Sequence, residues 1–521
     1  MSTATPSPAG GFLRYAVLWP LVPAMAMVMI DFTIVSISVT TIQDDLGISS
    51  TAAQWTVTAY ALATAAFVAL GGRLGDILGH RRIVTIGVIV FALASLMCGL
   101  VPDGDATASE AWLIAFRVIQ GIGGALLIPS ATVLVLNAFP TEERGKGLSL
   151  FFIVTGLFTA LGPIAGSYLT EYWTWRAIFW INVPVAIFAL LELRRSKLVD
   201  EPRRSPIDTR GAVLIVAGMA LSVLGIQQST VWGWDSPATI VSIVVGLALL
   251  AVFWRVEQRT DHPLIDIRQL KATRGFALDN LIMFLFFTVW LAIFLFGSIY
   301  FQISAGQPPS QAGFSILAVF YTFFGGSRLS GVWLDKIGPR VPVAAGLLCT
   351  GVGLAMWAHQ ATELEHINVL WGQLVTGFGL GLVMSAINTD ALNRVPAAAR
   401  GQASGVLQTT RNFGSAIGVA LLGTIILSIQ QSKTEDRLTD AGVPAGEASS
   451  IADSILSGGQ TGPPAGSGSE GDKIGQIITS GLPLDYAEAL QAAFYVGAGI
   501  MLVAFVIALL KLPRGRQEAV E

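Results

Sequence analysis

The sequence predicts an all-α integral membrane protein whose chain crosses the bilayer fourteen times. Two observations carry this prediction. Of the 521 residues, 53% are hydrophobic and only 12% are charged, whereas an average soluble chain has about 25% charged residues. In addition, apolar runs recur along the whole chain, and most of them reach the roughly 20 residues that a spanning helix needs. A soluble globular protein is therefore excluded.

The apolar runs define the expected spans. The first run is too long for a cleavable signal peptide, lacks a small-residue cleavage site and contains Asp31, so we expect it to remain as the first span. The fourteen spans are expected at 15–39, 53–71, 83–101, 112–138, 148–169, 177–193, 211–229, 237–254, 277–302, 311–330, 341–358, 367–389, 402–429 and 488–510.

The distribution of basic residues predicts the orientation. With the N-terminus inside, most of the 31 lysines and arginines fall in cytoplasmic segments, such as 81–82, 194–204 and 511–516, as the positive-inside rule requires. If the number of spans were wrong by one, every later loop would lie on the opposite side of the membrane and the asymmetry would be lost. The asymmetry therefore predicts an even number of spans, with both termini in the cytoplasm.

Two polar breaks are longer than the others. The break at 194–210 is basic and contains proline, and we expect it to be a cytoplasmic linker between two halves of the chain. The break at 430–487 is rich in Gly, Ser, Ala and acidic residues, a composition typical of flexible linkers. We expect it to form a largely disordered external loop.

A polar, glycine-containing signature occurs twice, each time at the cytoplasmic end of a span. Both copies read Gly-x-x-x-Asp-x-x-Gly followed by basic residues, which indicates an internal duplication. An ordinary tight loop between helices is the alternative. Glycine permits a tight turn, and an Asp beside arginines can form a charged latch that opens and closes as the halves rock. The first copy contains Gly72, Asp76, Gly79, Arg81 and Arg82, and the second Gly331, Asp335, Gly338 and Arg340.

Further motif residues lie along the chain in a fixed order. They are Asp31 and Thr33, then Trp55 and Tyr60, Arg117, Gln120 and Gly121, Gly156, Gly162, Pro163 and Gly166, Trp175, Arg176 and Asn182, and finally Arg400, Gly401 and Gly405. Together with the two signatures, this set resembles the major facilitator superfamily and, within it, the fourteen-span drug:proton antiporter branch. Two positions depart from the branch pattern, since Ser167 replaces a glycine and no proline lies near Thr40.

The resemblance implies a two-lobe helical bundle. We expect an N-terminal six-helix lobe at 1–193, a cytoplasmic linker with two additional helices at 194–276, and a C-terminal six-helix lobe at 277–521 that includes the external loop. It also implies a monomer in the plasma membrane, mainly of bacteria. Alternating access would occur by rocking of the lobes around a site near the midplane.

Asp31 is the expected proton-coupling residue. A carboxylate inside a span is costly and usually functional, and burial favours its neutral form, so it can take up a proton outside and release it inside. A buried Asp that a neighbouring helix satisfies is the structural alternative. Arg117 lies one helical turn from Gln120. It could hold a facing acid ionised when paired and release it when parted, or it could be a structural hydrogen-bond clip.

The fifth-span residues Gly156, Gly162, Pro163 and Gly166 predict a tightly packed and pliable helix, because glycines let helices approach closely and proline removes a backbone donor. The second half of the chain is rich in aromatic residues, which favours flat amphipathic molecules as the cargo. Most of these rings could instead face lipid or pack between helices. The expected substrate-cavity residues are Thr33, Trp55, Tyr60, Gln120, Trp290, Tyr300, Tyr321 and Arg411.

These observations predict a proton-coupled exporter of lipophilic, monocationic or neutral drugs or toxic metabolites. An uncoupled facilitator or a lipid or metabolite transporter of the same fold is the alternative, and a membrane enzyme is disfavoured because no paired acids or histidine constellation is visible. The formal charge of −3 offers no basic face for nucleic acid. No cofactor, metal or ATP is expected, since Cys98, Cys349 and the four histidines are scattered and no phosphate-binding loop occurs.

Overall fold

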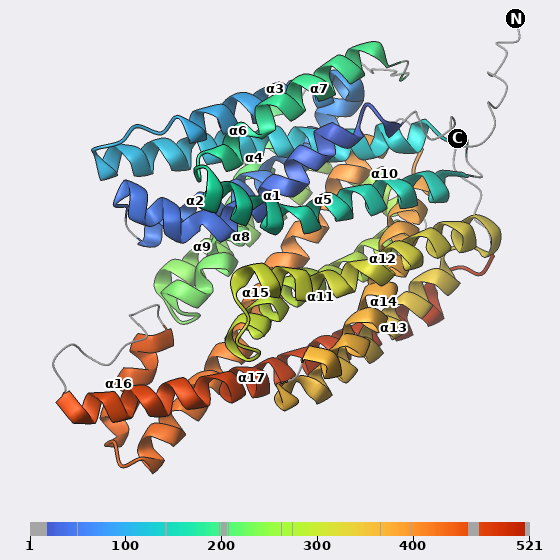
Figure 1. The fold of residues 1–521 in the computed structure, drawn as a ribbon. Coiled ribbons are helices and arrows are strands. Elements are labelled where there is room, and N and C mark those ends of the chain that lie inside the picture. The colour runs from blue at the N-terminus through green and yellow to red at the C-terminus, as the bar shows by residue number, and fades with distance from the viewer. Residues whose placement is uncertain are drawn as a thin grey trace, which may run out of the picture.

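The computed structural model describes residues 18–456 and 468–515, apart from 49, 141–142, 197, 199–205, 207, 262, 274, 365 and 397–398. Some helical side chains within these ranges, including that of Pro163, also lie outside the described residues. The described chain is a bundle of long helices that run back and forth between two ends (Figure 1).

The first group of helices, which we call the N-lobe, runs from α1 to α7 and contains five candidate membrane spans and the shorter apolar stretch of α1. The last crossing is broken at Ile181 into two helices, which together make a span of 19 residues. The helices are α1 (Val22–Leu46), α2 (Ser50–Leu78), α3 (His80–Gly99), α4 (Ala106–Asn137), α5 (Arg144–Tyr172), α6 (Ala177–Trp180) and α7 (Asn182–Arg195).

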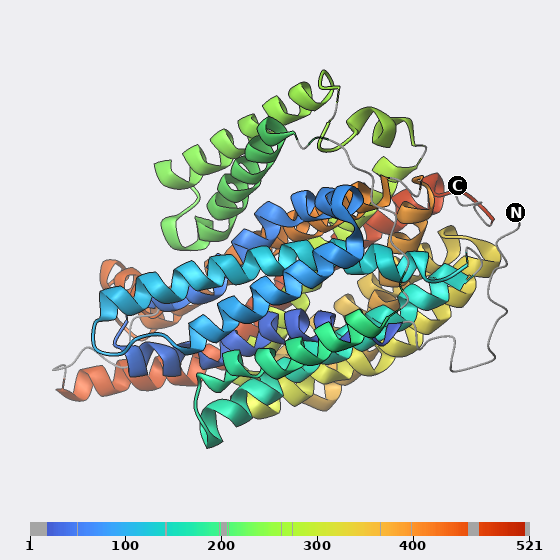
Figure 2. The ribbon, with the colours of Figure 1, turned by 90° about the horizontal axis from the view of Figure 1, so that it is seen from above.

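An inserted pair follows, consisting of α8 (Thr209–Trp232) and α9 (Pro237–Glu257), and the short α10 (Ile267–Ala272) leads out of it. The pair stands at one side of the bundle (Figure 2). There α8 packs against α2 and α15, one helix from each lobe. Large apolar side chains on α9, including Val241 and Val244, are exposed, as expected for a helix that faces lipid.

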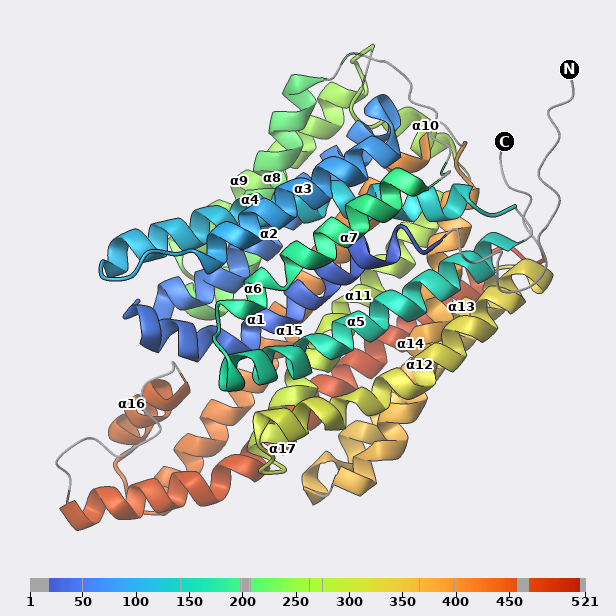
Figure 3. The ribbon, with the colours of Figure 1, turned by 45° about the horizontal axis from the view of Figure 1, so that its top comes forward.

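The second large group, which we call the C-lobe, contains six candidate membrane spans. It comprises α11 (Phe276–Ile303), α12 (Pro309–Ile337), α13 (Arg340–Gln360), the 3-10 helix η3 (Ala361–Glu363), α14 (His366–Asn393), α15 (Arg400–Asp440), α16 (Ala445–Leu456) and α17 (Gly468–Lys511). The lobes meet where α5 lies alongside α12 and α2 alongside α15 (Figure 3).

The expected spans all correspond to helices. In the described residues, thirteen helices are long and apolar enough to cross a membrane, and α1 adds a shorter apolar stretch, Val22–Val35. These elements are consistent with fourteen crossings, which confirms the predicted fold class.

Local sequence explains where several helices start and turn. The carboxylates of Asp105 and Asp208 accept hydrogen bonds from backbone N–H groups in the first turns of α4 and α8, which satisfies groups that would otherwise lack partners. Gly79 and Gly338 both adopt positive φ, 99° and 85°. They occupy equivalent turns, α2–α3 and α12–α13, and glycine alone adopts this conformation readily.

The long break at 430–487 differs from the expected disordered loop. Helix α15 continues to Asp440, α16 follows, and α17 begins well before its apolar segment. The extensions hold together because Arg437 forms an ion pair with Asp485 and Lys433 one with Glu488. The polar composition of this break predicts a flexible linker. In the structure, however, charged side chains of α15 and α17 pair with one another and support two helices. Residues 457–467 lie outside the described part of the chain.

Candidate functional site

The carboxylate of Asp31 lies at the centre of a buried polar network in the N-lobe. Its side chain has an exposed fraction of 0%. Arg117 Nη1 donates to Asp31 Oδ2 at 2.7 Å, and Gln120 Nε2 donates to Oδ1 at 2.8 Å. Asn182 Nδ2 lies 3.4 Å from the same Oδ1 atom. The acid is therefore ion-paired and hydrogen-bonded on both oxygens.

Three helices bring these groups together. Asp31 comes from the apolar part of α1, Arg117 and Gln120 lie one turn apart on α4, and Asn182 is the first residue of α7. The break between α6 and α7 places Asn182 at a helix start inside the bundle, where it also donates to Ser95 Oγ on α3 at 2.9 Å. The network thus joins four crossings of one lobe.

The guanidinium of Arg117 is satisfied on several sides. Its Nε donates to the carbonyl of Thr56 at 2.7 Å and its Nη1 to Gln120 Oε1 at 2.7 Å. Its Cζ lies 4.5 Å from the centre of the Tyr60 ring. A buried ion pair is tolerated only when its remaining polar groups have partners. Here the partners exist, and the pair as a whole is neutral.

The sequence-predicted residues Asp31, Arg117, Gln120 and Tyr60 are brought together here. Asn182 was noted only as part of a motif, and Ser95 and Thr56 were not noted at all. Asn182 could have been found from the sequence, because it is a polar amide within an apolar run and a buried amide needs a hydrogen-bond partner. Nothing in the sequence marks Thr56, which contributes only a carbonyl.

Thr33 belongs to a helix seam rather than to this network. Its Oγ1 donates to the carbonyl of Thr159 on α5 at 3.0 Å. A Cβ at Gly162 would lie 2.0 Å from Thr33 Oγ1, and one at Gly166 would lie 2.9 Å from Ile34. These two glycines therefore let α1 and α5 approach closely. The side chain of Pro163 lies outside the described residues.

A second cluster joins the lobes at the end of the bundle that holds the α2–α3 and α12–α13 turns, Leu18 and Leu512, which we call the terminal end. Asp76 Oδ1 accepts from the N–H of Gly401 at 2.9 Å, and Oδ2 accepts from the N–H of Gln402 at 2.8 Å. The carboxylate thus caps the first turn of α15 from the opposite lobe, where the helix dipole favours negative charge.

Close packing and further hydrogen bonds support this cap. A Cβ at Gly72 would lie 2.2 Å from the carbonyl oxygen of Gly401, so glycine is needed for the approach. More bonds cross between the lobes at the same end: Arg144 to Asn393, Arg400 to Asn137, Ser149 with Ser385, and Ser404 to the carbonyl of Pro129. The structure is therefore closed at its terminal end.

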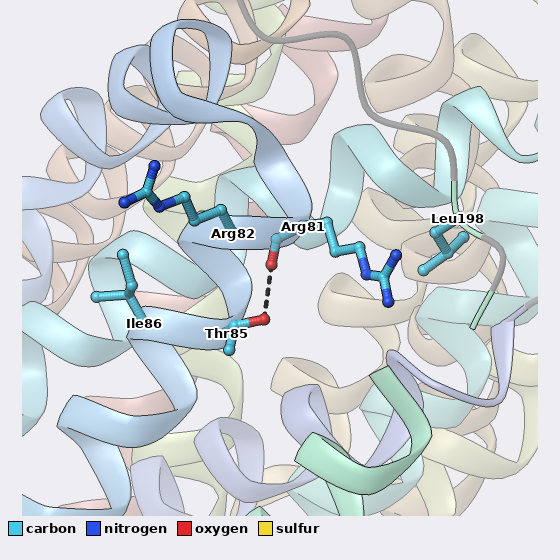
Figure 4. A pocket seen from close by; sticks show the side chains of 5 residues that line it. All are labelled: Arg81, Arg82, Thr85, Ile86 and Leu198. Atoms are coloured by element: carbon cyan, nitrogen blue, oxygen red, sulfur yellow. Dashed lines mark hydrogen bonds between the residues drawn. The ribbon is translucent and has the colours of Figure 1, made fainter. Parts of the chain in front are cut away.

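The other signature residues have more local surroundings. Arg81 Nη2 donates to the carbonyl of Leu193 at 2.7 Å and so ties α3 to α7 within the N-lobe. Arg82 points away from Arg81 and lines a surface depression with Thr85, Ile86 and Leu198 (Figure 4). Asp335 and Arg340 lie at the equivalent C-lobe turn, beside Gly338.

The C-lobe contributes a row of aromatic rings at the lobe interface. Trp290 on α11 lies 5.7 Å from Phe287 and 5.7 Å from Phe323 on α12, between ring centres. Phe323 in turn lies against Gly156 of α5, where a Cβ would be 3.3 Å from its ring. Arg411 stacks on the other end of the row, with its Cζ 4.4 Å from the centre of the Phe287 ring.

Three expected cavity residues lie elsewhere. Tyr300 is buried inside the C-lobe and donates to the carbonyl of Ala361 at 2.8 Å. Tyr321 is 77% exposed on the outer face of α12. Trp55 is half-buried near the start of α2. Neither tyrosine enters the site that we describe, and their cargo contacts stay predictions.

The chain resembles known transporters over most of its length. The model of the Major Facilitator Superfamily matches residues 21–419. The tetracenomycin C resistance and export protein of Streptomyces glaucescens is 31% identical, with 94% of this chain and 91% of that protein covered. The multidrug resistance protein Stp of Mycobacterium tuberculosis is 31% identical over 80% of this chain and 76% of its own length. The proton:xylose symporter XylE has a similar fold, with a TM-score of 0.60, 14% identity and 97% of both chains covered.

Proposed function

The chain belongs to the major facilitator superfamily, and on that premise we propose that it is a proton-coupled exporter that moves amphipathic small molecules out of the cell by alternating access. It is a multi-pass transporter of the plasma membrane related to drug-efflux proteins, and it is not an enzyme. Export against a gradient needs an energy source. The proposal assigns this role to protons moving inward through Asp31.

The observation that carries the proposal is the fully buried pair of Asp31 and Arg117. Adding a proton to Asp31 would remove the charge that balances Arg117. The guanidinium would then keep only neutral partners, among them the carbonyl of Thr56 and Gln120 Oε1. A buried unpaired cation is unfavourable, so protonation favours a conformation in which Arg117 reaches water or a new partner.

Because the network joins α1, α3, α4 and α7, such a rearrangement acts on the whole N-lobe. The bonds between Asp76 and α15 hold the terminal end closed in the present structure. We assign the terminal end to the cytoplasm, following the excess of basic residues in its loops. The proton would then enter from the opposite, external side. Its release inside would follow when the cap on α15 opens.

The two lobes and the inserted pair would move as the units that the sequence indicates, with α8 and α9 lying beside the moving interface as a monomer in the bilayer. The relatives named above support drug or antibiotic cargo. An uncoupled facilitator or a lipid or metabolite transporter of the same fold is the alternative function. It would leave the ion pair of Asp31 and Arg117 as a purely structural element.

Reconstituted transport tests the proposal. The protein in liposomes should move a lipophilic fluorescent probe when a pH gradient is imposed, and a protonophore should abolish the movement. Liposomes without protein give the background, and a membrane potential imposed without a pH gradient separates the two driving forces. Probe movement that is the same with and without the gradient would favour the uncoupled facilitator and contradict the proposal.

A further inference from the structure

Arg411 lies deep in the C-lobe and on the side that faces the N-lobe. At 1.5 Å per residue, Arg411 lies about 16 Å along the helix axis from the start of α15 at Arg400. Asp31 lies about 14 Å along α1 from Val22, which is a similar distance from the start of its helix. Ser404 lies about two turns before Arg411 on the same face. Its hydroxyl donates to the carbonyl of Pro129 on α4, so this face of α15 is directed at the opposite lobe.

The guanidinium of Arg411 has no acidic counter-ion among the described residues. Its recorded contact there is the face of the Phe287 ring, 4.4 Å away. Its neighbour Thr410 donates to Asn280 on α11, and that amide is thereby engaged with another residue. The side chain as a whole is half-buried.

Three buried acids of the membrane helices are occupied elsewhere. Asp31 pairs with Arg117 at 2.7 Å, and Arg394 lies 2.9 Å from Asp279 and 2.6 Å from Asp390. An uncompensated guanidinium in a low-dielectric interior is unfavourable. It is therefore a ready partner for an anion that enters between the lobes, and Asp31 is not free to receive a cation.

Next to this charge lies a row of aromatic rings whose planes are tilted by 39° and 67° from one ring to the next. The rings of Phe287, Trp290 and Phe323 follow one another at 5.7 Å from Arg411 toward α5. The far end of the row lies against Gly156 of α5, where the absence of a side chain lets Phe323 approach the N-lobe backbone closely. Aromatic surfaces of this kind bind planar apolar bodies, and a few polar groups fix their orientation.

We propose that Arg411, Phe287 and Trp290 form a subsite for the acidic group of a flat aromatic cargo, an ionised carboxylate or phenolate whose ring system lies on the aromatic row. The guanidinium would donate charge-assisted hydrogen bonds to the oxyanion. This inference rests on the proposed function and narrows its cargo. It proposes a monoanionic cargo in place of the expected monocationic or neutral one, because Asp31 is paired with Arg117.

Equilibrium binding to the purified full-length protein tests the subsite without any proton gradient. The probes are a fluorescent polycyclic aromatic carboxylate, its neutral methyl ester, and a lipophilic monocationic dye of similar size, each followed by fluorescence anisotropy. The wild-type protein should bind the carboxylate about tenfold or more tightly than the ester, the size expected for charge-assisted hydrogen bonds.

Two variants separate charge from packing. Arg411→Gln should remove the preference for the carboxylate and leave ester affinity within about twofold. Arg411→Lys should retain part of the preference, because lysine keeps the charge but not the planar guanidinium that stacks on Phe287. Arg328→Gln, at an exposed arginine of α12, serves as the matched control and should leave both affinities unchanged. Thermal unfolding of each variant checks that it is folded.

The inference is overturned if the wild-type protein binds the ester or the cationic dye as tightly as the carboxylate, or if Arg411→Gln weakens both neutral and acidic probes equally. Failure of the proposed function would be recognised differently. In that case the carboxylate preference and its dependence on Arg411 would persist, while no probe moved in response to a pH gradient in liposomes.

Discussion

The two lobes share the same turn signature but neutralise their interior arginines differently. In the N-lobe, Arg117 is held by the buried carboxylate of Asp31, and the pair has no net charge. In the C-lobe, Arg411 stacks on an aromatic ring, and no acid among the described residues balances it. The repeat therefore preserves the architecture of the helices, while the polar residues inside it differ, and our proposals assign a separate task to each lobe.

The acids of the C-lobe sharpen this contrast. Asp279 on α11 and Asp390 on α14 both lie against Arg394, close to the terminal end of the bundle. Two buried carboxylates thus share one guanidinium there, while a guanidinium deeper in the same lobe stays unbalanced. A neutral, switchable pair suits proton exchange, and an isolated cation suits recognition of an anion.

The largest effect should come from breaking the N-lobe pair. Asp31→Asn keeps the size and much of the hydrogen bonding of the side chain but cannot lose or gain a proton. We expect folded protein with gradient-driven transport reduced to the level of empty liposomes, and carboxylate binding within about twofold of wild type, since Arg411 is untouched. Transport in proteoliposomes and probe anisotropy measure the two quantities.

Asp44→Asn is the matched control, because Asp44 lies on the same helix but is exposed. It should transport at the wild-type rate. Wild-type transport by Asp31→Asn would contradict the coupling role of Asp31, and loss of carboxylate binding in the same variant would contradict the division of tasks between the lobes.

The next largest effect concerns the seam between α1 and α5, which supports Asp31. A Cβ at Gly162 would lie 2.0 Å from Thr33 Oγ1 and 2.9 Å from the carbonyl oxygen of Ile30. Gly162→Leu should block transport, and Gly162→Ala should be milder, with overpacking that costs about 1–3 kcal/mol. Thermal unfolding and transport rate are the measurements.

Removing the atom that clashes provides the control. Adding Thr33→Ala to Gly162→Ala should restore part of the lost stability, because Thr33 Oγ1 is the nearest obstacle. The seam assignment fails if leucine and alanine at position 162 give equal activity, or if the double variant is no more stable than Gly162→Ala alone.

A smaller effect is expected from the cap that joins the lobes. Asp76→Asn loses the charge at the start of α15 and can accept only one of its two backbone hydrogen bonds with the remaining oxygen, a loss of about 1–2 kcal/mol. The equilibrium should shift toward a conformation that is open at the terminal end, by about tenfold. The alkylation rate of a cysteine placed at Ser385, in a background without Cys98 and Cys349, measures this opening.

Asp208→Asn removes the same kind of helix cap from α8, but this cap is made within one segment of the chain and does not connect the two lobes. Its alkylation rate at position 385 should equal that of the parent protein. An unchanged rate in Asp76→Asn, or an equal increase in both variants, would show that the cap does not hold the terminal end closed.

Hydropathy predicted every crossing, because length and apolarity are what the bilayer requires of a span. It could not predict the direction of individual side chains. Tyr321 is exposed on the outer face of α12, whereas Phe323 two residues later is buried at the lobe interface. Lipid tails and protein interiors are equally apolar, so the sequence of a span carries little information on which face is buried.

The polar residues were more informative, and their limits are also physical. A charge inside a span must find a partner, which identified Asp31 and Arg117. The sequence could not show that they are partners of each other. The expected monocationic or neutral cargo rested mainly on the aromatic residues of the second half and stays a prediction. Contacts made by backbone carbonyls, such as that of Thr56 to Arg117, leave no mark in the sequence. Ion pairs such as Arg437 with Asp485, which support helical extensions, depend on a tertiary contact.

The smallest effect should come from the other end of the N-lobe, where an acid and an arginine are paired near the surface. Asp45 Oδ2 accepts from Trp175 Nε1 at 2.8 Å and from Arg176 Nη1 at 2.9 Å. These hydrogen bonds hold the pKa of Asp45 below its ordinary value of 3.8. Because the pKa is lowered in the folded state, the pair stabilises the protein above pH 3.8 and loses this contribution as the pH falls through the folded-state value.

Asp45→Asn should therefore reduce thermal stability at pH 7 and have less effect at pH 3, which lies below 3.8, where the unfolded chain takes up a proton at Asp45 and the contribution is being lost. The side chain is 48% exposed, so solvent screening limits the difference at pH 7 to about 1 kcal/mol or less. Unfolding temperatures of both proteins at the two pH values measure it. A gap that widens at pH 3 would contradict the ionised pairing. Unchanged transport by the variant at pH 7 would separate this surface pair, which only stabilises, from the buried pair, to which we assign proton coupling.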